Sequence, residues 1–388
     1  MIKFIHTADW HLGRPFHSVE GTGQRHRLQQ ARIDAVKNIG VLAEKESASF
    51  ILVAGDLFDS PTPTRETVAE ALAAIGALGL PVHAIPGNHD HGGPAGPWGN
   101  DHLIREREHL APNLTVHEDG VPVEVEGVTL LPAPLRRRHE RTDPTLWIRN
   151  VPFAELDSDR PRVVLAHGSV TSFSSPTDGD DPLSGAPNLI SLEHLPMEEL
   201  DYVALGDWHG TFQVNGRAWY SGTPEPDRFP KGTAYQSGNV LVVTVQRGEL
   251  PDVRPEKAGN IQWREAELST SSDTELEDLL SDIDALTGPR VQKDVLRLRV
   301  SGVLGFSARE RLEDRLEDFR ARLLMADIDL SGLHLRPTDE ELAELQDRAG
   351  DPVLSSVAQA LLRDLEGGND PTVALALQRL YTFVNEEA

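Results

Sequence analysis

The sequence predicts an α/β protein, and three observations lead to this fold class. Short apolar runs typical of buried parallel strands alternate with longer segments of helical periodicity along residues 3–85. Several of these runs end in Asp, Asn or His. The same order of apolar run and polar end returns at residues 163–167 and 202–209, after short strands between 114 and 131. We therefore expect a sandwich of two sheets over residues 1–264.

Composition narrows the class of protein. The 388 residues suffice for two or three structural units, and no apolar run approaches the roughly 20 residues that span a bilayer. The start resembles a strand and not a signal peptide, so we expect a cytoplasmic protein without membrane contact. The net charge of −25 excludes a uniformly basic surface for nucleic acid, although not a local basic track. The absence of cysteine means that any metal is held by nitrogen and oxygen.

The first strand and helix are expected at residues 3–6 and 24–46. Asp9 and His11 follow this strand. Residues two apart in an extended segment point to the same side, which lets a carboxylate and an imidazole meet at one ion.

Two further strands, at residues 50–54 and 81–85, flank a helix expected at 64–78. Asp56 follows the first of them, and Pro86 and Gly87 stop the second ahead of Asn88, His89 and Asp90. Ligands of parallel α/β sheets bind at these carboxyl ends.

In the second sheet, His167 follows the strand at 163–166, and Asp207 and His209 follow the strand at 202–205. Residues 218–221 and 240–245 are expected to close this sheet. The strand-end residues supply carboxylate, imidazole and amide groups but no sulfur, which suits a pair of Mn²⁺, Fe²⁺ or Zn²⁺ ions. Two such ions about 3.5–4 Å apart activate water and neutralise a phosphate. Asp56 is the natural bridging ligand.

The ordered motifs resemble those of the calcineurin-like metallophosphoesterase superfamily. They are Asp9-x-His11, Gly55-Asp56-x-x-Asp59, Gly87-Asn88-His89-Asp90, His167-Gly168 and Gly206-x-x-His209. Residues 55–59, 165–168 and 220–225, with the chain length, are similar to SbcD-type DNA repair nucleases.

This resemblance implies a four-layer α/β/β/α sandwich with two bound ions. One ion would lie on Asp9, His11, Asp56 and His209, and the other on Asp56, Asn88, His167 and residue 207. His89 would act on the scissile phosphate as proton donor or charge stabiliser, with Asp90 orienting its ring. The resemblance also implies an SMC-like coiled-coil ATPase of the SbcC type as partner.

Asp207 departs from the family pattern, in which Gly-His-x-His stands where this chain has Gly206-Asp207-Trp208-His209. A carboxylate at this position would bind the second ion directly or through water. It favours Mn²⁺ or Mg²⁺ over softer ions, and we expect Mn²⁺.

Basic residues near the expected site are few. Arg136, Arg137 and Arg138 are candidates for binding DNA phosphates, and a solvated surface loop is an equally good interpretation. Arg228 and Lys231 are second candidates.

Residues 265–336 predict a small α+β unit, which in SbcD-type proteins caps the DNA groove and selects the ends that enter. It would contain a helix over 265–284, a strand over 295–300 with Arg297 and Arg299 on its open side, and a strand over 327–335. A capping box from Ser307 to Glu310 would open a helix between these strands.

Residues 337–388 predict three amphipathic helices, at 338–348, 352–366 and 371–385. Such helices either dock on their own domain or bind a partner such as the ATPase coiled coil.

The expected function is a two-metal nuclease that hydrolyses phosphodiester bonds in DNA, as an exonuclease and endonuclease acting on single- or double-stranded ends in repair and recombination. The alternative is a phosphodiesterase of the same superfamily that acts on nucleotides or other small molecules. A binding scaffold without catalysis is disfavoured because the ligand set is nearly complete. A homodimer is a further expected assembly.

Overall fold

The computed structural model describes residues 1–171, 187–230, 232, 235–346, 352–367 and 371–386. The chain forms two compact units, Met1–Trp263 and Arg264–Ala388. Lys231 and the end of the helix predicted at 338–348 lie outside the described residues. Among the described helices, none has the length and apolar character needed to cross a membrane.

The first sheet of unit 1 has the strand order β14-β13-β1-β2-β3-β4. β1, β2, β3 and β4 are parallel, whereas β13 and β14 continue the sheet in antiparallel fashion. The strands are β1 (Ile2–Thr7), β2 (Ile51–Val53), β3 (Val82–Ala84), β4 (Leu114–Val116), β13 (Asn239–Val245) and β14 (Asp252–Lys257).

The second sheet has the order β11-β12-β10-β7-β6-β5, with a parallel centre of β12, β10, β7 and β6. Its strands are β5 (Val123–Val125), β6 (Val128–Ala133), β7 (Arg162–His167), β10 (Tyr202–Gly206), β11 (Phe212–Gln213) and β12 (Ala218–Tyr220). β8 (Ser169–Val170) and β9 (Leu189–Ile190) form a separate small parallel pair.

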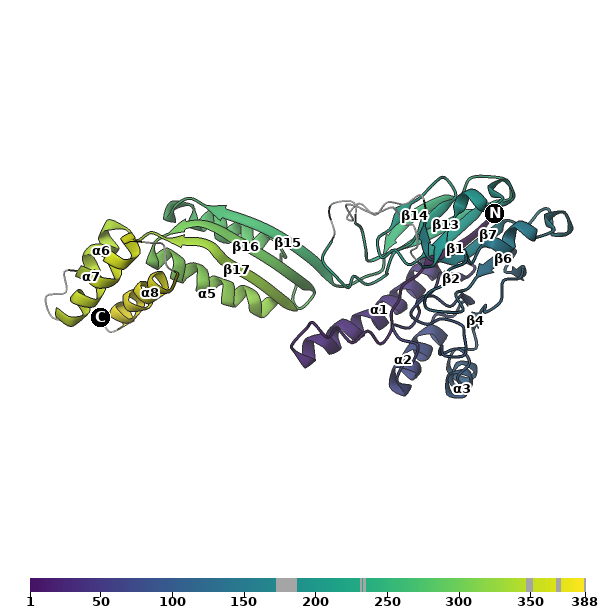
Figure 1. The fold of residues 1–388 in the computed structure, drawn as a ribbon, viewed down its shortest axis with the longest axis horizontal. Coiled ribbons are helices and arrows are strands. Elements are labelled where there is room, and N and C mark those ends of the chain that lie inside the picture. The colour runs from purple at the N-terminus through teal and green to yellow at the C-terminus, as the bar shows by residue number, and fades with distance from the viewer. Residues whose placement is uncertain (172–186, 231, 233–234, 347–351, 368–370, 387–388) are drawn as a thin grey trace. The chain divides into compact units, whose positions relative to one another are not determined.

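The two sheets pack face to face. Buried side chains from both, among them Phe4, Leu52, Leu165 and Tyr202, form one core between the sheets. A second core lies between the first sheet and helices on its outer face. Figure 1 shows α1 (Thr22–Glu46), α2 (Arg65–Gly76) and α3 (Asp101–Leu110) on that side.

The outer face of the second sheet is covered by short 3-10 helices and loops. Ile148, Val151, Leu192 and Leu195 pack there against β6, β7 and β10. The 3-10 helices span Leu146–Asn150, Phe153–Glu155, Leu192–His194 and Met197–Glu199. The predicted α/β sandwich with C-terminal helices is confirmed, and its fourth layer consists of these short turns.

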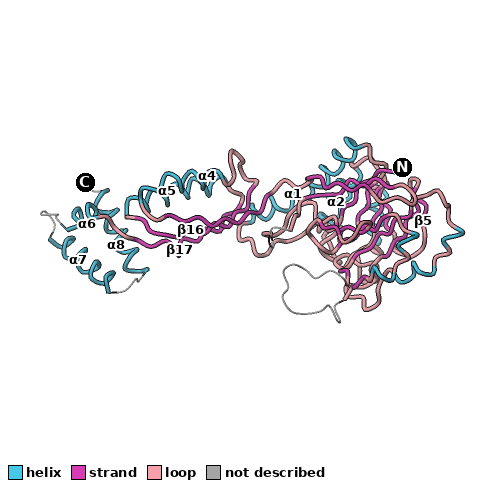
Figure 2. Tube along the Cα trace, turned by 90° about the horizontal axis from the view of Figure 1, so that it is seen from above, coloured by secondary structure: helices cyan, strands magenta, loops and turns pink. Residues whose placement is uncertain are grey.

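Unit 2 contains a sheet of order β15-β16-β17. Two helices, α4 and α5, run beside its strands (Figure 2). The elements are β15 (Gln262–Thr270), a 3-10 turn (Asp273–Glu275), α4 (Leu276–Ala285), β16 (Asp294–Leu304), α5 (Phe306–Arg322) and β17 (Met325–Leu335). The helices bury Leu279, Leu312 and Phe319 against the sheet. Arg297 and Arg299 pair with Glu265 and Glu267 and are partly exposed.

The chain ends in α6 (Asp339–Gln346), α7 (Pro352–Gly367) and α8 (Pro371–Glu386). Ala358, Leu377 and Tyr381 pack with Phe306 of α5 in a small core, so these helices dock on their own unit. The predicted domain boundary at 336/337 lies inside unit 2.

Four local features differ from prediction. Residues 240–245, expected to close the second sheet, form β13 of the first sheet, because they pair antiparallel with β1. The helix α3 was not foreseen, although Asn100 caps it by accepting from the N–H groups of His102 and Leu103. Residues 265–270, predicted as helix, belong to strand β15, because hydrogen bonding with β16 outweighs their weak local preference.

The predicted capping box at Ser307 does not form. Helix α5 begins after Gly305, which provides no side-chain cap. Glu341 instead accepts from the N–H groups of Phe306 and Ser307 at 3.1 and 2.9 Å. Glu341 also completes a reciprocal capping box with Thr338 at the start of α6.

Candidate metal centre

The carboxyl ends of strands from both sheets meet at one place. Asp9 and His11 follow β1, and Asp56 follows β2. Hydrogen bonds from Asp9 N to Gly55 O (3.1 Å) and from His11 N to Asp56 O (2.9 Å) join these two loops. Asp9, His11 and Asp56 have φ angles of 54°, 43° and 54°, which turn the chain sharply as each strand ends.

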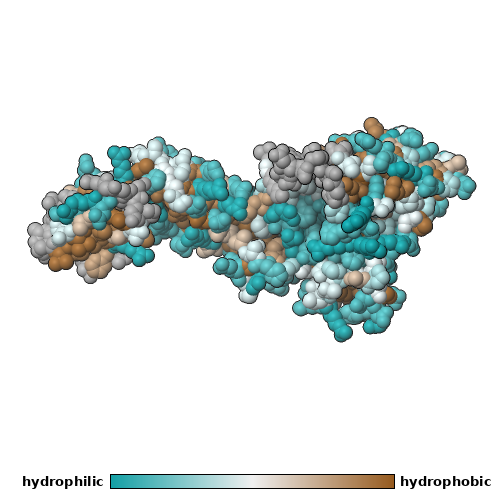
Figure 3. All heavy atoms as spheres, in the orientation of Figure 1, coloured by the Kyte–Doolittle hydropathy of each residue, from teal (hydrophilic) through white to brown (hydrophobic). Residues whose placement is uncertain are grey.

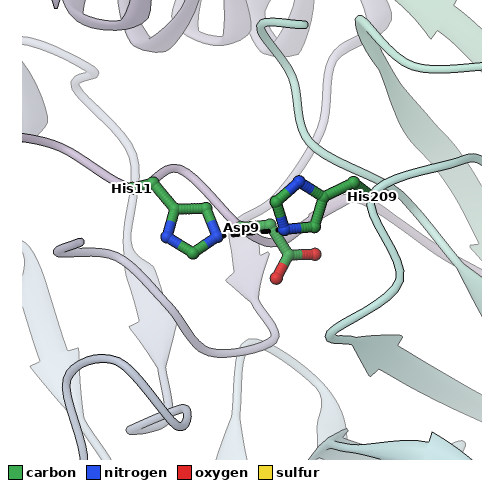
Figure 4. A group of neighbouring side chains, drawn as sticks. All are labelled: Asp9, His11 and His209. Carbon is green, nitrogen blue, oxygen red and sulfur yellow. Dashed lines mark hydrogen bonds between the residues drawn. The ribbon is translucent and has the colours of Figure 1, made fainter. Parts of the chain in front are cut away.

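Five of the predicted ligands lie in overlapping groups whose ligand atoms are within 4.8 Å of one another. The groups are Asp9, His11 and His209; Asp9, Asp56 and His167; and His11, Asp56 and His89. Figure 4 shows the rings of His11 and His209 facing each other beside the Asp9 carboxylate, and their Nε2 atoms lie 3.1 Å apart. The structure thus brings together carboxylates and imidazoles from residues almost 200 positions apart in the chain. Their role as ligands stays a prediction.

Two buried acceptor atoms fit a metal ion. Oδ1 of Asn88 and Nε2 of His167 are buried and have no hydrogen-bond partner among the described residues. Nδ1 of His167 donates to the carbonyl of Ala54 at 2.7 Å, which leaves the lone pair on Nε2. That nitrogen lies 3.5 Å from Oδ2 of Asp56. A divalent cation would satisfy both atoms.

Glycines before the site residues allow this close approach. A Cβ at Gly55 would lie 2.3 Å from Nδ1 of His167, and one at Gly87 would lie 2.2 Å from Oδ1 of Asp56. Glycine is therefore needed before Asp56 and Asn88, because a side chain at either position would clash with another residue of the centre.

Burial perturbs the proton affinities at the centre. It raises the pKa of Asp56 well above its usual value and also raises the pKa of Asp9. Burial and the neighbouring His209 lower the pKa of His11. For His167 burial alone lowers the pKa, but the carboxylates of Asp56 and Asp9 outweigh it and raise the pKa to about 9. A bound cation would further lower the electrostatic cost of these buried carboxylates.

Asp207 lies on the His167 side of the centre. Its Oδ1 is 3.8 Å from Nε2 of His167, and its Oδ2 accepts from the hydroxyl of Ser169 at 2.7 Å. Its backbone N–H donates to the carboxylate of Asp9. The shorter side chain thus occupies the place where the family has imidazole.

Asp90 does not orient His89, contrary to the prediction. Its Oδ2 accepts from the N–H groups of Leu57 and Phe58, and its Oδ1 from that of Gly87. The ring of His89 is held instead by the carbonyl of Asp59, which accepts from Nδ1 at 2.8 Å. The Asp90 carboxylate accepts these hydrogen bonds because buried backbone N–H groups need acceptors.

Sequence reasoning missed Asp227 as part of this centre. Its Oδ2 lies 3.3 Å from Nδ1 of His209. Asp59, which was given no role, has Oδ1 3.2 Å from Nδ1 of His11. Neither residue ends a strand, and the only available signal for Asp227 was its place just after the motif at 220–225.

The arginine run at 136–138 is exposed and follows β6. Leu135 N donates to Pro86 O and Gly92 N donates to Leu135 O, so this segment is joined to the loop that carries His89. Arg136 forms an exposed ion pair with Asp119.

Comparison with known families decides the class. The family described as calcineurin-like phosphoesterase matches residues 2–224, more than half of the chain. The chain belongs to this family. As a calcineurin-like phosphoesterase it is a metal-dependent enzyme that hydrolyses phosphoesters, and the family uses two divalent metal ions.

Two solved structures show a distant similarity to this calcineurin-like phosphoesterase. The protein TT1561 of Thermus thermophilus has 13% identity and a TM-score of 0.39, and the match covers 66% of this chain and 99% of that one. The phosphopantetheinyl hydrolase PptH from Mycobacterium tuberculosis has 13% identity and a TM-score of 0.33, with coverages of 57% and 90%.

Proposed function

We propose that this phosphoesterase is a two-metal DNA nuclease that processes DNA ends. The observation that carries the proposal is the exposed run Arg136, Arg137 and Arg138, whose segment is hydrogen-bonded to the loop of His89. In a chain of net charge −25, three adjacent exposed arginines on a segment joined to the loop of His89 are suited to the backbone of a polyanionic substrate.

Different residues of the chain have different roles in the proposed reaction. Asp9, His11, Asp56, Asn88, His167, Asp207 and His209 would hold the two ions, with Asp56 between them. When bound, the ions supply an activated water and neutralise charge on the phosphate. Because Nδ1 of His89 donates to Asp59, Nε2 is its reactive nitrogen, and as imidazolium it would protonate the departing 3′ oxygen. Mn²⁺ is the proposed native ion because Asp207 adds a hard oxygen ligand.

Bis-p-nitrophenyl phosphate and a labelled oligonucleotide separate the nuclease from a small-molecule phosphodiesterase. With Mn²⁺ the enzyme should hydrolyse both. Replacing Arg136, Arg137 and Arg138 by Gln should reduce kcat/KM for the oligonucleotide at least tenfold more than for the small diester. The matched control replaces Arg65, Arg105 and Arg254, which are exposed arginines of α2, α3 and β14. Hydrolysis of the small diester without DNA cleavage by the unaltered enzyme would overturn the proposal.

The proposed partner is an SMC-like coiled-coil ATPase of the SbcC type, bound by the helices of residues 337–388. Although these helices dock on their own unit, Val357, Leu375 and Phe383 are exposed at 43%, 46% and 49%. Figure 3 shows apolar surface over this end of the chain. Such side chains fit a helix-in-groove contact. Residues 265–336 are proposed to select DNA ends, and a homodimer is the proposed assembly.

Size-exclusion chromatography with the ATPase tests this partner. Val357→Glu together with Phe383→Glu should abolish co-elution, because burying two carboxylates in an apolar interface is costly. The control is Val41→Glu, at an exposed apolar residue on α1. Unchanged co-elution of the double variant would contradict the proposed surface.

A further inference from the structure

Asp227 is the centre of a charged cluster beside the metal centre. Its side chain is fully buried, and its Oδ2 lies 3.2 Å from Nη2 of Arg14 and 3.6 Å from Nη2 of Arg32. Nε of Arg228 donates to Oδ1 at 2.9 Å. The same carboxylate contacts Nδ1 of His209. Three arginines from separate segments therefore converge on one buried carboxylate that also holds a predicted metal ligand.

The cluster combines arginines with acidic side chains. Arg14 also pairs with Asp59, at 3.3 Å, and Glu225 is a third carboxylate that interacts with Arg32. Three guanidinium groups thus gather here in a chain with 62 acidic and 37 basic side chains. An arginine that reaches solvent next to a centre for phosphoester hydrolysis is placed to meet an anionic ligand.

The three arginines differ in their exposure to solvent. Arg32 is almost fully buried and donates to the carbonyl of Trp10 at 2.7 Å, which makes it part of the scaffold. The side chains of Arg14 and Arg228 are 26% and 40% exposed. Only these two reach solvent, where an incoming group could meet them.

We propose that Arg14 and Arg228 form a phosphate-binding subsite for the DNA backbone phosphate next to the scissile one. This proposal rests on the proposed nuclease function. Asp227 anchors both guanidinium groups, so little side-chain entropy remains to be lost on binding. Each guanidinium has five N–H donors, and Asp227 takes only part of those of Arg228, at Nε and Nη2. The remaining donors suit phosphate oxygens.

A purely structural role is the alternative, in which the arginines only neutralise Asp227 and position His209. The two roles differ in salt dependence. Each phosphate contact that an arginine makes releases counterions, so its loss reduces the slope of log affinity against log salt by about 0.7–0.9. A structural arginine would not change this slope.

Fluorescence anisotropy of the full chain with Mn²⁺ and a labelled phosphorothioate oligonucleotide, which resists cleavage, measures the slope. Arg14→Gln and Arg228→Gln should each weaken binding about tenfold and reduce the slope by nearly one. Arg228→Lys keeps the charge and should retain the slope with intermediate affinity. The control is Arg160→Gln, since Arg160 is also partly exposed and paired with two carboxylates, Asp157 and Glu124.

Kinetics give a second measurement. Bis-p-nitrophenyl phosphate has no neighbouring phosphate, so the loss of kcat/KM in Arg228→Gln should be at least tenfold greater for the oligonucleotide. Equal losses on both substrates, or an unchanged salt slope, would overturn the subsite while the nuclease function stands. An unaltered enzyme that hydrolyses the small diester but neither binds nor cleaves DNA would overturn the nuclease function, and the subsite with it.

Discussion

The carboxylate of Asp90 accepts a hydrogen bond from the backbone N–H of Leu57 at 2.9 Å. This contact and a second one from the N–H of Phe58 tie the loop after β3 to the loop after β2. The N–H of Gly87, in the same loop as Asp90, donates to the other carboxylate oxygen. Asp90 is therefore a structural clamp between the two loops that carry Asp56 and Asn88.

Asp90→Ala should destabilise the protein by about 3 kcal/mol, because three backbone donors would lose a charged acceptor. Urea unfolding measures this loss. Asp119→Ala, at an exposed ion pair, is the control and should change the free energy of unfolding by about 0.5 kcal/mol or less. If Asp90→Ala kept full stability and changed only the pH profile of activity, Asp90 would be orienting a catalytic group instead.

His89→Ala should lower kcat by about a hundredfold or more, since the leaving oxygen would lose its proton donor. Both ions should still bind, as measured by calorimetric titration with Mn²⁺. His109→Ala, on the exposed face of α3, serves as the control. Because His89 lies within a group with His11 and Asp56, loss of one ion would show that it is a ligand.

Asp207→His restores the imidazole of the family pattern. Nitrogen suits Zn²⁺ better than carboxylate oxygen does, so the ratio of activity with Zn²⁺ to activity with Mn²⁺ should rise about tenfold. Steady-state hydrolysis of bis-p-nitrophenyl phosphate with each metal measures the ratio. Asp207→Asn, which removes the charge alone, separates charge from ligand type. An unchanged ratio in the His variant would mean that residue 207 does not reach the ion.

His117 makes the fold sensitive to acid. Burial, and then the nearby His83, lower the pKa of His117 to about 4, and His83 in turn contacts Glu126. The unfolded chain takes up a proton near pH 6.5, whereas the folded chain does so only near pH 4. Stability from this group is therefore present above pH 6.5 and is lost as pH falls toward 4.

Comparison of urea unfolding at pH 7.5 and 4.5 tests this effect. The unaltered protein should lose about 2 kcal/mol more than His117→Gln over this interval. His26→Gln, at an exposed histidine of α1, should behave like the unaltered protein. Equal losses in His117→Gln and the unaltered protein would contradict the assignment.

Much of the fold followed from local patterns. The strands that carry the site were predicted within about two residues, because their short length and the glycine and polar residues that bound them favour a buried strand over a helix. Asp9, Asp56 and His167 were chosen for the same reason, since each directly follows such a run. Helix α3 was missed because its only buried residue is Leu103, which leaves no apolar stripe to detect.

Contacts between distant segments could not be predicted in this way. Residues 265–270 form a strand because β16 offers hydrogen-bond partners, and α5 is capped by Glu341, 35 positions away from Phe306. Likewise, the place of Asp227 just after the motif at 220–225 does not indicate that this residue contacts His209 and three arginines.

By itself, the sequence determined which chemical groups stand at the ends of the strands and hence the kind of ion that could bind there. Only the tertiary structure decided which partner each of these groups has, as the separate tasks of Asp90 and Asp227 show. The physical reason is that strand propensity and ligand type are properties of neighbouring residues, whereas the partner of a buried charge depends on which distant segments the packed sheets bring beside it.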